Sequence, residues 1–402
     1  MKSIFFNDKE VTGFFRAKHV TVPQRKVDKY KLYISALYVS IQNAILQFLN
    51  RRIYSKRKRH PNRILVFRTG SLGDSVCATP ALSAIRKHFP GAQITLLTNA
   101  GGKNLVNPVN VISKNLYDDV IDYLGVQPFE LYKILKKRKF DYVIQLPQVD
   151  ASFFSLIRDL IFFRFIASEG WGWKISRALL FKKVLEKNVA YPNESERLIN
   201  LAKENGIETA ENKFHLNISS DDKQKVEEYF LQNGIQDKKV ITVAVGANSV
   251  KNRWPINYFE EVIKHFHHKY PILLSGGKDD IELVSRFNGM YQVYNTCGMF
   301  TPMQSALLIK KSAVALCNDT GPLHLSYAVG TPIVGLFASR DFYGKWFPPE
   351  NSVNRTFRTP DIDCSLCFFN ACSNNICMQA IMPSDVISAV EELASIRMKP
   401  CE

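Results

Sequence analysis

The chain has 402 residues, 46% of them hydrophobic and 22% charged, which is enough for two globular domains and excludes a disordered or low-complexity protein. Its net charge of +16 is concentrated at one end, because residues 1–60 hold 14 Lys and Arg against three acidic residues and so carry +11 of it. Basicity confined to a terminal segment argues against a nucleic-acid-binding body, and we expect no nucleic acid among the partners.

The N-terminal segment combines basic flanks with the uncharged stretch 32–49, which the basic segment 51–59 follows. On a helix, its polar and apolar side chains fall on opposite sides: Ser35, Gln42, Asn43 and Gln47 against Ile34, Leu37, Tyr38, Ile41, Ile45, Phe48 and Leu49. This pattern favours a helix lying in an anionic membrane surface over a spanning helix or a signal peptide. A helix packed on the domain, with a solvated basic tail, is the alternative.

From residue 63 onward, apolar strands alternate with amphipathic helices. The first series predicts strands at 63–68, 91–98, 117–123 and 141–146 and helices at 80–89 and 128–137. The second predicts strands at 240–245, 271–275, 292–295, 314–317 and 332–337 and helices at 256–267, 302–311 and from 324. Continuous apolar strands between helices indicate parallel sheets covered on both faces. We therefore predict an α/β fold of two doubly wound, Rossmann-like domains facing across a cleft.

Residues 153–183 are rich in aromatic and basic side chains, including Trp171 and Trp173. Two interpretations remain open for this segment. It forms two core helices with solvated charges, or it forms a surface that receives an anionic, lipid-linked acceptor.

The loop after the first strand, residues 69–74, reads TGSLGD. Its glycines and its strand-to-helix position resemble a nucleotide loop, but it lacks the Gly-Lys-Ser/Thr ending of a P-loop. Asp74 could merely cap the next helix. If it faces the cleft, Asp74 is a candidate general base for an acceptor hydroxyl.

Three small-residue loops follow strands of the second series, at 246–255 (GANSVKNRWP), 276–280 (GGKDD) and 318–324 (NDTGPLH). In the third loop, Thr320 offers a hydroxyl and Gly321 lets a ligand approach open N–H groups at a helix N-terminus. An ordinary helix capped by Asp319 or Thr320 is the alternative. Three such loops at the strand ends of one domain favour a nucleotide diphosphate.

Four of the eight cysteines form a cluster with the spacing C-x2-C-x4-C-x4-C: Cys364, Cys367, Cys372 and Cys377. This spacing permits a four-thiolate zinc site. It equally permits reduced structural thiols or a pair of local disulfides.

The order of these motifs resembles glycosyltransferase family 9, the bacterial heptosyltransferases of lipopolysaccharide assembly, over roughly residues 63–394. The resemblance is carried by Gly73-Asp74 with 79–82, by 193–207, 253–255, 276–277, 318–325 with 330–332, and by the cysteine segment that ends at 377–378. It implies a GT-B architecture with an acceptor domain at 63–215 and a nucleotide-sugar domain at 216–402. These domains follow the basic extension at 1–62, which the charge and helix pattern described above predicts to be a membrane-surface anchor.

The resemblance also implies an inverting, single-displacement transfer in which Asp74 is the base and Ser71 and Gly73 belong to the acceptor-side loop. It assigns donor binding to a larger set: Asn248, Ser249, Asp280 (at the ribose), Asp319, Thr320, Gly321, Leu323 and His324. Many members place a Lys two residues before the Trp of the Trp-Pro pair, where this chain has Asn252, so Lys251 or Arg253 would substitute.

The sequence therefore predicts an enzyme that moves a sugar, heptose by resemblance, from a nucleotide-diphosphate donor such as ADP-heptose to a lipid-linked or lipopolysaccharide-type glycan. No cofactor is required, apart from structural zinc if the cysteines bind it. The expected location is cytoplasmic, on the inner face of the cytoplasmic membrane. The alternatives are a GT-B transferase that uses another nucleotide-hexose and a catalytically silent, membrane-tethered nucleotide- or glycan-binding protein.

Overall fold

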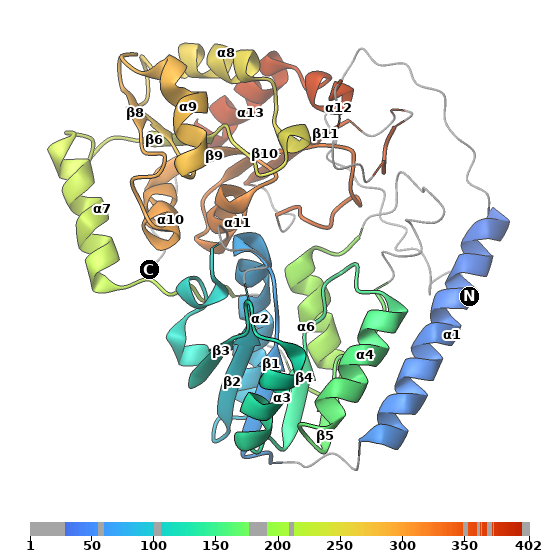
Figure 1. Cartoon of the computed structure of the whole chain (residues 1–402). Helices are drawn as coiled ribbons and strands as arrows, with labels where there is room; N and C mark the ends of the chain where they lie inside the picture. Colours follow the sequence, from blue (N-terminus) through green and yellow to red (C-terminus); the bar gives the residue numbers. More distant parts are fainter. Residues whose placement is uncertain are drawn as a thin grey trace. The chain divides into compact units, whose positions relative to one another are not determined.

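The computed structural model describes residues 29–54, 60–99, 106–176, 191–208, 213–348, 353–359, 362, 364–367, 372 and 374–395 (Figure 1). These residues divide into two compact units. The N-terminal unit contains those within Val27–Leu185 and Glu194–Asn217. The C-terminal unit contains those within Glu186–Asn193 and Ile218–Glu402.

The N-terminal unit is built on a parallel sheet whose strand order in the described chain is β3-β2-β1-β4-β5. Its strands are β1 (Arg63–Phe67), β2 (Gln93–Thr98), β3 (Asp119–Asp122), β4 (Tyr142–Gln145) and β5 (Glu169–Trp171). One face packs on α2 (Leu72–His88) and α6 (Glu194–Glu204). The other packs on α1 (Lys29–Ile53), α3 (Pro128–Lys137) and α4 (Phe153–Arg164). Apolar side chains on both faces of each central strand are buried, as a doubly covered sheet requires.

Helix α2 begins earlier than the sequence predicts, so that Gly73 and Asp74 lie in its first turn and Pro80 lies inside it. A proline removes the hydrogen bond to the carbonyl four residues before it. Here that carbonyl, on Val76, accepts a hydrogen bond from the Thr79 hydroxyl at 2.9 Å. The helix therefore continues through Pro80 without leaving a buried acceptor unpaired.

Helix α1 packs on the N-terminal unit next to α4 (Figure 1). The side that faces the unit buries Ser35, Ala36, Val39 and Leu46. The opposite side exposes a row of apolar and aromatic side chains: Tyr30, Tyr33, Ile34, Leu37, Tyr38, Ile41, Ile45 and Phe48. No helix in the described part of the chain is long and apolar enough to cross a membrane.

The C-terminal unit also contains a parallel sheet, ordered β11-β10-β9-β6-β7-β8 in the described residues. The strands are β6 (Val240–Ala244), β7 (Ile272–Leu274), β8 (Val293–Asn295), β9 (Ser312–Asn318), β10 (Ile333–Phe337) and β11 (Asn354–Arg358). Helices α8 (Ile256–Phe266) and α13 (Pro383–Ser395) cover one face. On the other side, α7 (Ser220–Gln232) and α10 (Pro302–Lys310) pack together, and α11 (Gly321–Ala328) contacts β9 and β10.

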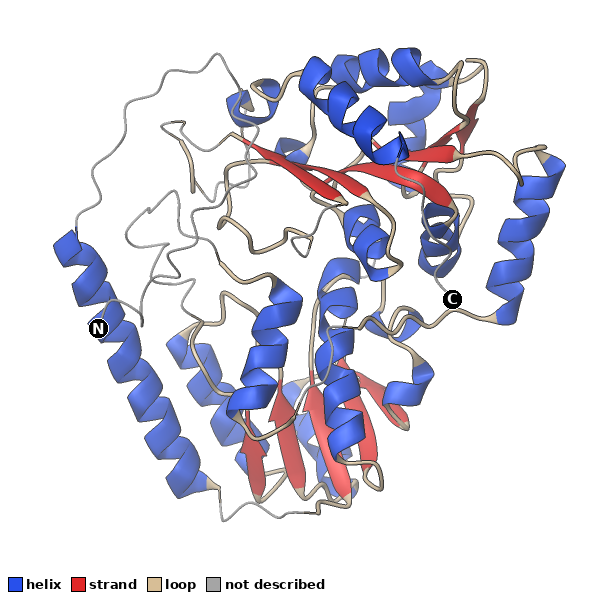
Figure 2. Ribbon diagram, turned by 180° about the vertical axis from the view of Figure 1, so that it is seen from behind, coloured by secondary structure: helices blue, strands red, loops and turns tan. Residues whose placement is uncertain are grey.

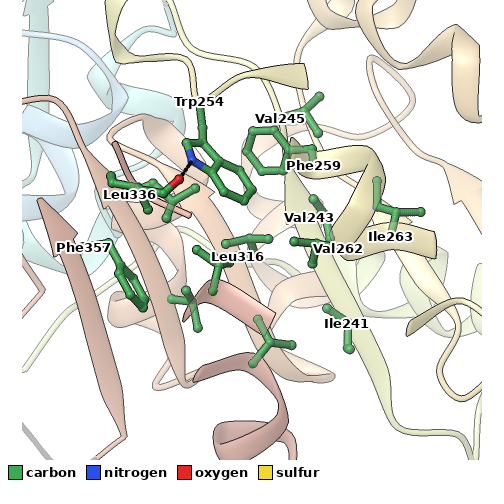
Figure 3. Packing of buried hydrophobic residues seen from close by; sticks show 14 of the residues in the cluster. Ile241, Val243, Val245, Trp254, Phe259, Val262, Ile263, Leu316, Leu336 and Phe357 are labelled. Carbon is green, nitrogen blue, oxygen red and sulfur yellow. Dashed lines mark hydrogen bonds between the residues drawn. The ribbon is translucent and has the colours of Figure 1, made fainter. Parts of the chain in front are cut away.

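Trp254 lies in the core under α8, against Phe259 and Val245 (Figure 3). Its indole Nε1 donates to the carbonyl of Ile381 at 2.9 Å, which satisfies the one polar atom of a buried ring. The tryptophan thus fixes the end of the 246–255 loop to the core.

Each predicted strand is present within two residues of its expected bounds. Figure 2 shows the strands of the two sheets in red. The two doubly wound domains are therefore confirmed. In the segment 153–183, α4 is followed by strand β5, and both interpretations of this segment stay predictions. Trp171 and Trp173 are both buried, and residues 177–183 lie outside the described chain.

Candidate functional site

Asp74 lies at the carboxyl end of β1, in the first turn of α2. Its Oδ2 accepts hydrogen bonds from the Ser71 backbone N–H at 3.1 Å and from the Ser71 hydroxyl at 3.2 Å. Gly70 has a φ of +132°, and a Cβ at that position would overlap Asp74 at 2.4 Å, so only glycine fits beside this carboxylate. The side chain of Asp74 remains 17% exposed, which leaves it open to an incoming hydroxyl.

A buried ion network holds the other oxygen of Asp74. Arg68 is 1% exposed, and its Nη2 lies 3.3 Å from Asp74 Oδ1 and 3.1 Å from Glu194 Oε1. Glu194 is fully buried and also pairs with Arg197 at 2.6 Å. Burial raises the pKa of Asp74; Arg68 lowers it and Glu194 raises it further, and the net pKa lies above the ordinary value. A carboxylate with a raised pKa is a better proton acceptor, so the geometry suits a general base as well as a cap.

The loop between β9 and α11 presents an open helix N-terminus. Thr320 is the N-cap residue, yet its side chain makes no capping hydrogen bond. Pro322, in the first turn, has no N–H to lose. The Thr320 hydroxyl and the positive end of the helix dipole are therefore available to an anion.

Asp319 lies just before this N-terminus and is in an environment that disfavours its charge. Burial is the main cause, and the neighbouring Asp341 adds to it, so that the pKa of Asp319 is raised to about 7 against the opposing effects of Lys345 and Arg340. Asn252 donates to the Asp319 carboxylate at 3.4 Å. A carboxyl that is half protonated near neutral pH opposes an anionic ligand less than an ionised one.

Lys251 is the residue of the 246–255 loop that most clearly indicates an anion-binding site. Its side chain is buried at 4% exposure, and its Nζ has no hydrogen-bond partner among the described residues. Burial lowers the pKa of Lys251, and the neighbouring Arg340 lowers it further. A buried, unpaired ammonium is costly in the free protein, and a bound anion would remove that cost.

Arg340, after β10, extends this group of cations. Its Nη1 donates to the Ser249 hydroxyl at 3.4 Å, whereas its buried Nε has no partner in the described chain. Lys345 pairs with Asp341 at 3.1 Å. Arg253 instead bonds its own loop, through Nε to the Ala247 carbonyl at 2.9 Å. Of the two cations that could replace the family lysine, the geometry thus favours Lys251.

Other predicted donor residues have mainly structural contacts. Leu323 is fully buried, and its N–H donates to the Thr320 carbonyl at 3.1 Å. His324 is 5% exposed, and its Nδ1 lies 2.8 Å from the Tyr327 hydroxyl. Asp280 accepts from the Gly277 N–H at 2.9 Å. Asn248 is exposed, and the donor-binding roles of all four remain predictions.

Asn318, the first residue of the 318–324 loop, hydrogen-bonds this loop to the 246–255 loop and to the end of β6. It is fully buried, donates to the Val245 carbonyl at 2.9 Å and accepts from the Trp254 N–H at 3.0 Å. It thereby ties the carboxyl ends of β6 and β9 together. The loops that carry Lys251 and Thr320 are held next to one another as a result.

The cysteine cluster contains no disulfide among the described residues: Cys364 and Cys372 are exposed, Cys367 is half-buried and Cys377 is buried. Within the described ranges, no group of three or more His, Cys, Asp or Glu side chains is placed to hold a metal ion. Burial raises the pKa of Cys377, a backbone hydrogen bond at Ser339 lowers it, and the charges of the other three cysteines raise it further. Zinc binding here remains a prediction from the sequence.

Sequence reasoning missed four charged residues of these sites: Arg68, Glu194, Arg340 and Lys345. Arg68 was visible as a charge at the end of an apolar strand. Glu194 was visible in the 193–207 stretch. The sequence around Arg68 and Glu194 does not show that these two side chains pair with each other.

Comparison with known proteins identifies the chain's relatives. A family model described as glycosyltransferase family 9 (heptosyltransferase) matches residues 129–377. The lipopolysaccharide core heptosyltransferase OpsX of Haemophilus influenzae is 26% identical over 286 residues, which cover 69% of this chain and 79% of OpsX. Among solved structures, a family 9 glycosyl transferase from Veillonella parvula matches with a TM-score of 0.64 at 19% identity, over 85% of this chain and 99% of that one. The Escherichia coli ADP-heptose lps heptosyltransferase II matches with a TM-score of 0.57 at 21% identity, over 83% and 98%.

Proposed function

The chain belongs to glycosyltransferase family 9, and we propose that it transfers heptose from ADP-heptose to a sugar of a lipopolysaccharide-type glycan. Its similarity to OpsX and to the Escherichia coli ADP-heptose lps heptosyltransferase II supports this donor. The observation that carries the proposal is the group of cations beside an uncapped helix N-terminus, with Lys251 buried and unpaired among the described residues. Such a group fits a diphosphate, which offers several charged oxygens to the ammonium, the guanidinium and the open N–H groups.

In the proposed reaction, Asp74 takes the proton of the acceptor hydroxyl as its oxygen bonds to the anomeric carbon. The bond from that carbon to the diphosphate oxygen breaks, and the electron pair leaves with ADP. Lys251, Arg340 and the N-terminus of α11 stabilise the charge that develops on the leaving diphosphate. The single displacement inverts the configuration at the anomeric carbon.

Donor binding tests the proposal and has a predicted pH dependence. In thermal-shift titrations with ADP-heptose and with GDP-, UDP- and dTDP-sugars, we expect the ADP-sugar to give the largest stabilisation. Its affinity should fall as the pH rises through about 7, because Asp319 then becomes ionised and repels the diphosphate. The diphosphate of a nucleotide-sugar does not itself titrate in this range, so a change of affinity with pH arises from a group of the protein.

Asp319→Asn supplies the control. The variant should bind the ADP-sugar with an affinity that does not change between pH 6 and pH 8. No stabilisation by any of the four nucleotide-sugars contradicts the proposed function. A pH dependence that persists in Asp319→Asn contradicts the role of Asp319.

We also propose that the protein works on the inner face of the cytoplasmic membrane, with the exposed side of α1 in the lipid surface. Ile34, Leu37, Ile41, Ile45 and Phe48 recur at helical spacing on that side and are 41–68% exposed. Arg52 at the end of the helix is exposed and suits anionic head groups. Nearby α4 and the residue that follows it expose three more apolar side chains: Phe154, Ile161 and Phe165.

Replacing Leu37, Ile41 and Phe48 together by serine should reduce binding to phosphatidylglycerol vesicles by tenfold or more in co-sedimentation. Burying one such side chain contributes about 1.5–3 kcal/mol when complete, so partial loss at three positions suffices for this effect. Leu231→Ser, at an exposed leucine of α7, is the matched control and should bind as the unaltered protein does. Unchanged binding of the triple variant would show that α1 does not make the contact.

A metal at the cysteine cluster stays a separate prediction. Elemental analysis for zinc and iron in the purified protein, compared with a Cys364→Ser and Cys367→Ser double variant, tests it directly.

A further inference from the structure

A cavity of about 730 Å³ lies entirely within the N-terminal unit, between the inner side of α1 and the segment around β5, with α6 completing the wall. In the described sheet, β5 is an edge strand, and α1 packs along this flank. Neither the Asp74 loop nor any donor-loop residue lines the cavity. Its volume is typical of a small-molecule site.

The walls of the cavity are fixed by specific contacts. Asn43 of α1 accepts from the Ile175 N–H at 2.8 Å and donates to the Ile175 carbonyl at 3.3 Å. Tyr54 stacks on Trp173 with ring centroids 5.0 Å apart, and its hydroxyl donates to the Leu160 carbonyl at 3.3 Å. The helix is therefore held against the domain at both ends of the cavity, and the site is preorganised.

Two buried polar atoms of the lining residues have no partner among the described residues: the Oδ1 of Asn50 and the Nε1 of Trp173. Trp173 is only 2% exposed, so its N–H cannot reach bulk water freely. Such groups are costly to leave unpaired. One of these atoms is an acceptor and the other a donor, which are the two functions that a hydroxyl group combines.

The rest of the lining narrows the class of ligand. Gln47 adds an amide one turn from Asn43 and Asn50, and Lys174 pairs with Glu204 at the wall. The amides of Gln47 and Asn50 suit a molecule with hydroxyls, whereas an acyl chain would leave the Asn50 carbonyl oxygen unpaired. The cavity has no uncapped helix N-terminus among its described lining, unlike the donor loops, so it does not resemble a diphosphate site.

We propose that this cavity is a saccharide-binding site, separate from the site of transfer, which holds a sugar of the membrane glycan while the outer side of α1 rests on lipid. The choice of this glycan rests on the proposed function, whereas the recognition of a saccharide rests on the cavity alone. One helix then serves two purposes, with its apolar side toward lipid and its amide side toward the sugar.

The indole N–H of Trp173 reports occupancy directly. We expect deacylated, water-soluble lipopolysaccharide core oligosaccharide to shift the Trp173 indole resonance of the full-length, ¹⁵N-tryptophan-labelled protein, in a saturable manner. The resonance is assigned with Trp173→Phe. Trp254, whose indole is already bonded to Ile381, should not shift. Asn50→Leu should raise the dissociation constant at least tenfold, while Gln42→Leu, on the same helix outside the lining, should not change it.

Ala44→Trp, which fills the cavity from its exposed rim, is a second variant should Asn50→Leu fold poorly. A Trp173 resonance that does not respond to the oligosaccharide, or one that responds equally in Asn50→Leu and Ala44→Trp, overturns the proposal. Stabilisation by the ADP-sugar is measured on the same samples. The Trp173 resonance thus tests the saccharide site, and stabilisation by the ADP-sugar separately tests the proposed donor.

Discussion

Asp74→Asn is expected to reduce the rate of transfer about 10²- to 10⁴-fold and to leave donor affinity unchanged. The amide keeps the size of the side chain but cannot take a proton from the acceptor hydroxyl, and general base catalysis contributes about this much. In the unaltered protein, kcat/KM should fall as the pH decreases through the pKa of Asp74. Burial holds that pKa above the ordinary aspartate value, so the loss begins at a higher pH than for an exposed aspartate.

The chain offers a matched control for the capping role of Asp74. Asp222 occupies the same position in α7 and accepts from the Ser219 N–H at 3.0 Å and the Ser219 hydroxyl at 2.7 Å. The loss of the capping interaction should therefore lower the free energy of unfolding by about the same amount in Asp222→Asn and Asp74→Asn, on the order of 1 kcal/mol. Asp222→Asn should not lose transfer activity. Equal transfer rates in the two variants would show that Asp74 only caps α2 and is not the catalytic base. A loss confined to Asp74→Asn supports the base.

The fold could be predicted from the sequence wherever burial is continuous. Strands such as VITVA at Val240–Ala244 are apolar throughout and stand out in any context. The missed strands lack this pattern: β5 has three residues and begins with a glutamate, and β11 reads NRTFR. Both are at the edge of their sheets, where pairing with one neighbour, and not local sequence, decides that they are strands.

The site could be predicted only in its local part. The 318–324 loop was recognisable because an anion site at a helix N-terminus is encoded by neighbouring residues. The pairing of Arg68 with Glu194 joins residues 126 positions apart, so nothing local encodes it. The same holds for Arg340, which reaches Ser249 across 91 positions. The polar side of α1 was visible in the sequence, but the sequence does not show that this side faces the domain.

Lys251→Met should weaken binding of the ADP-sugar by tenfold or more and leave the melting temperature of the ligand-free protein unchanged or raised. A hydrogen bond to a charged group contributes about 1.5–3 kcal/mol, which corresponds to a tenfold or larger change in affinity. In the free protein, the ammonium is buried without a partner in the described chain, so an apolar side chain of similar length removes a cost and no contact.

Lys251→Met is thus expected to weaken donor binding without lowering the melting temperature, and a purely structural role of Lys251 does not predict this combination. A lysine kept for packing or for a structural ion pair would lose stability when replaced, and its donor affinity would change only as far as the fold is disturbed. Lys310→Met, at an exposed lysine of α10, should change neither quantity. Calorimetric titration with the ADP-sugar and thermal unfolding of the same preparations give both numbers. A destabilised Lys251→Met with unchanged affinity would place the diphosphate elsewhere, with Arg340 as the next cation to test.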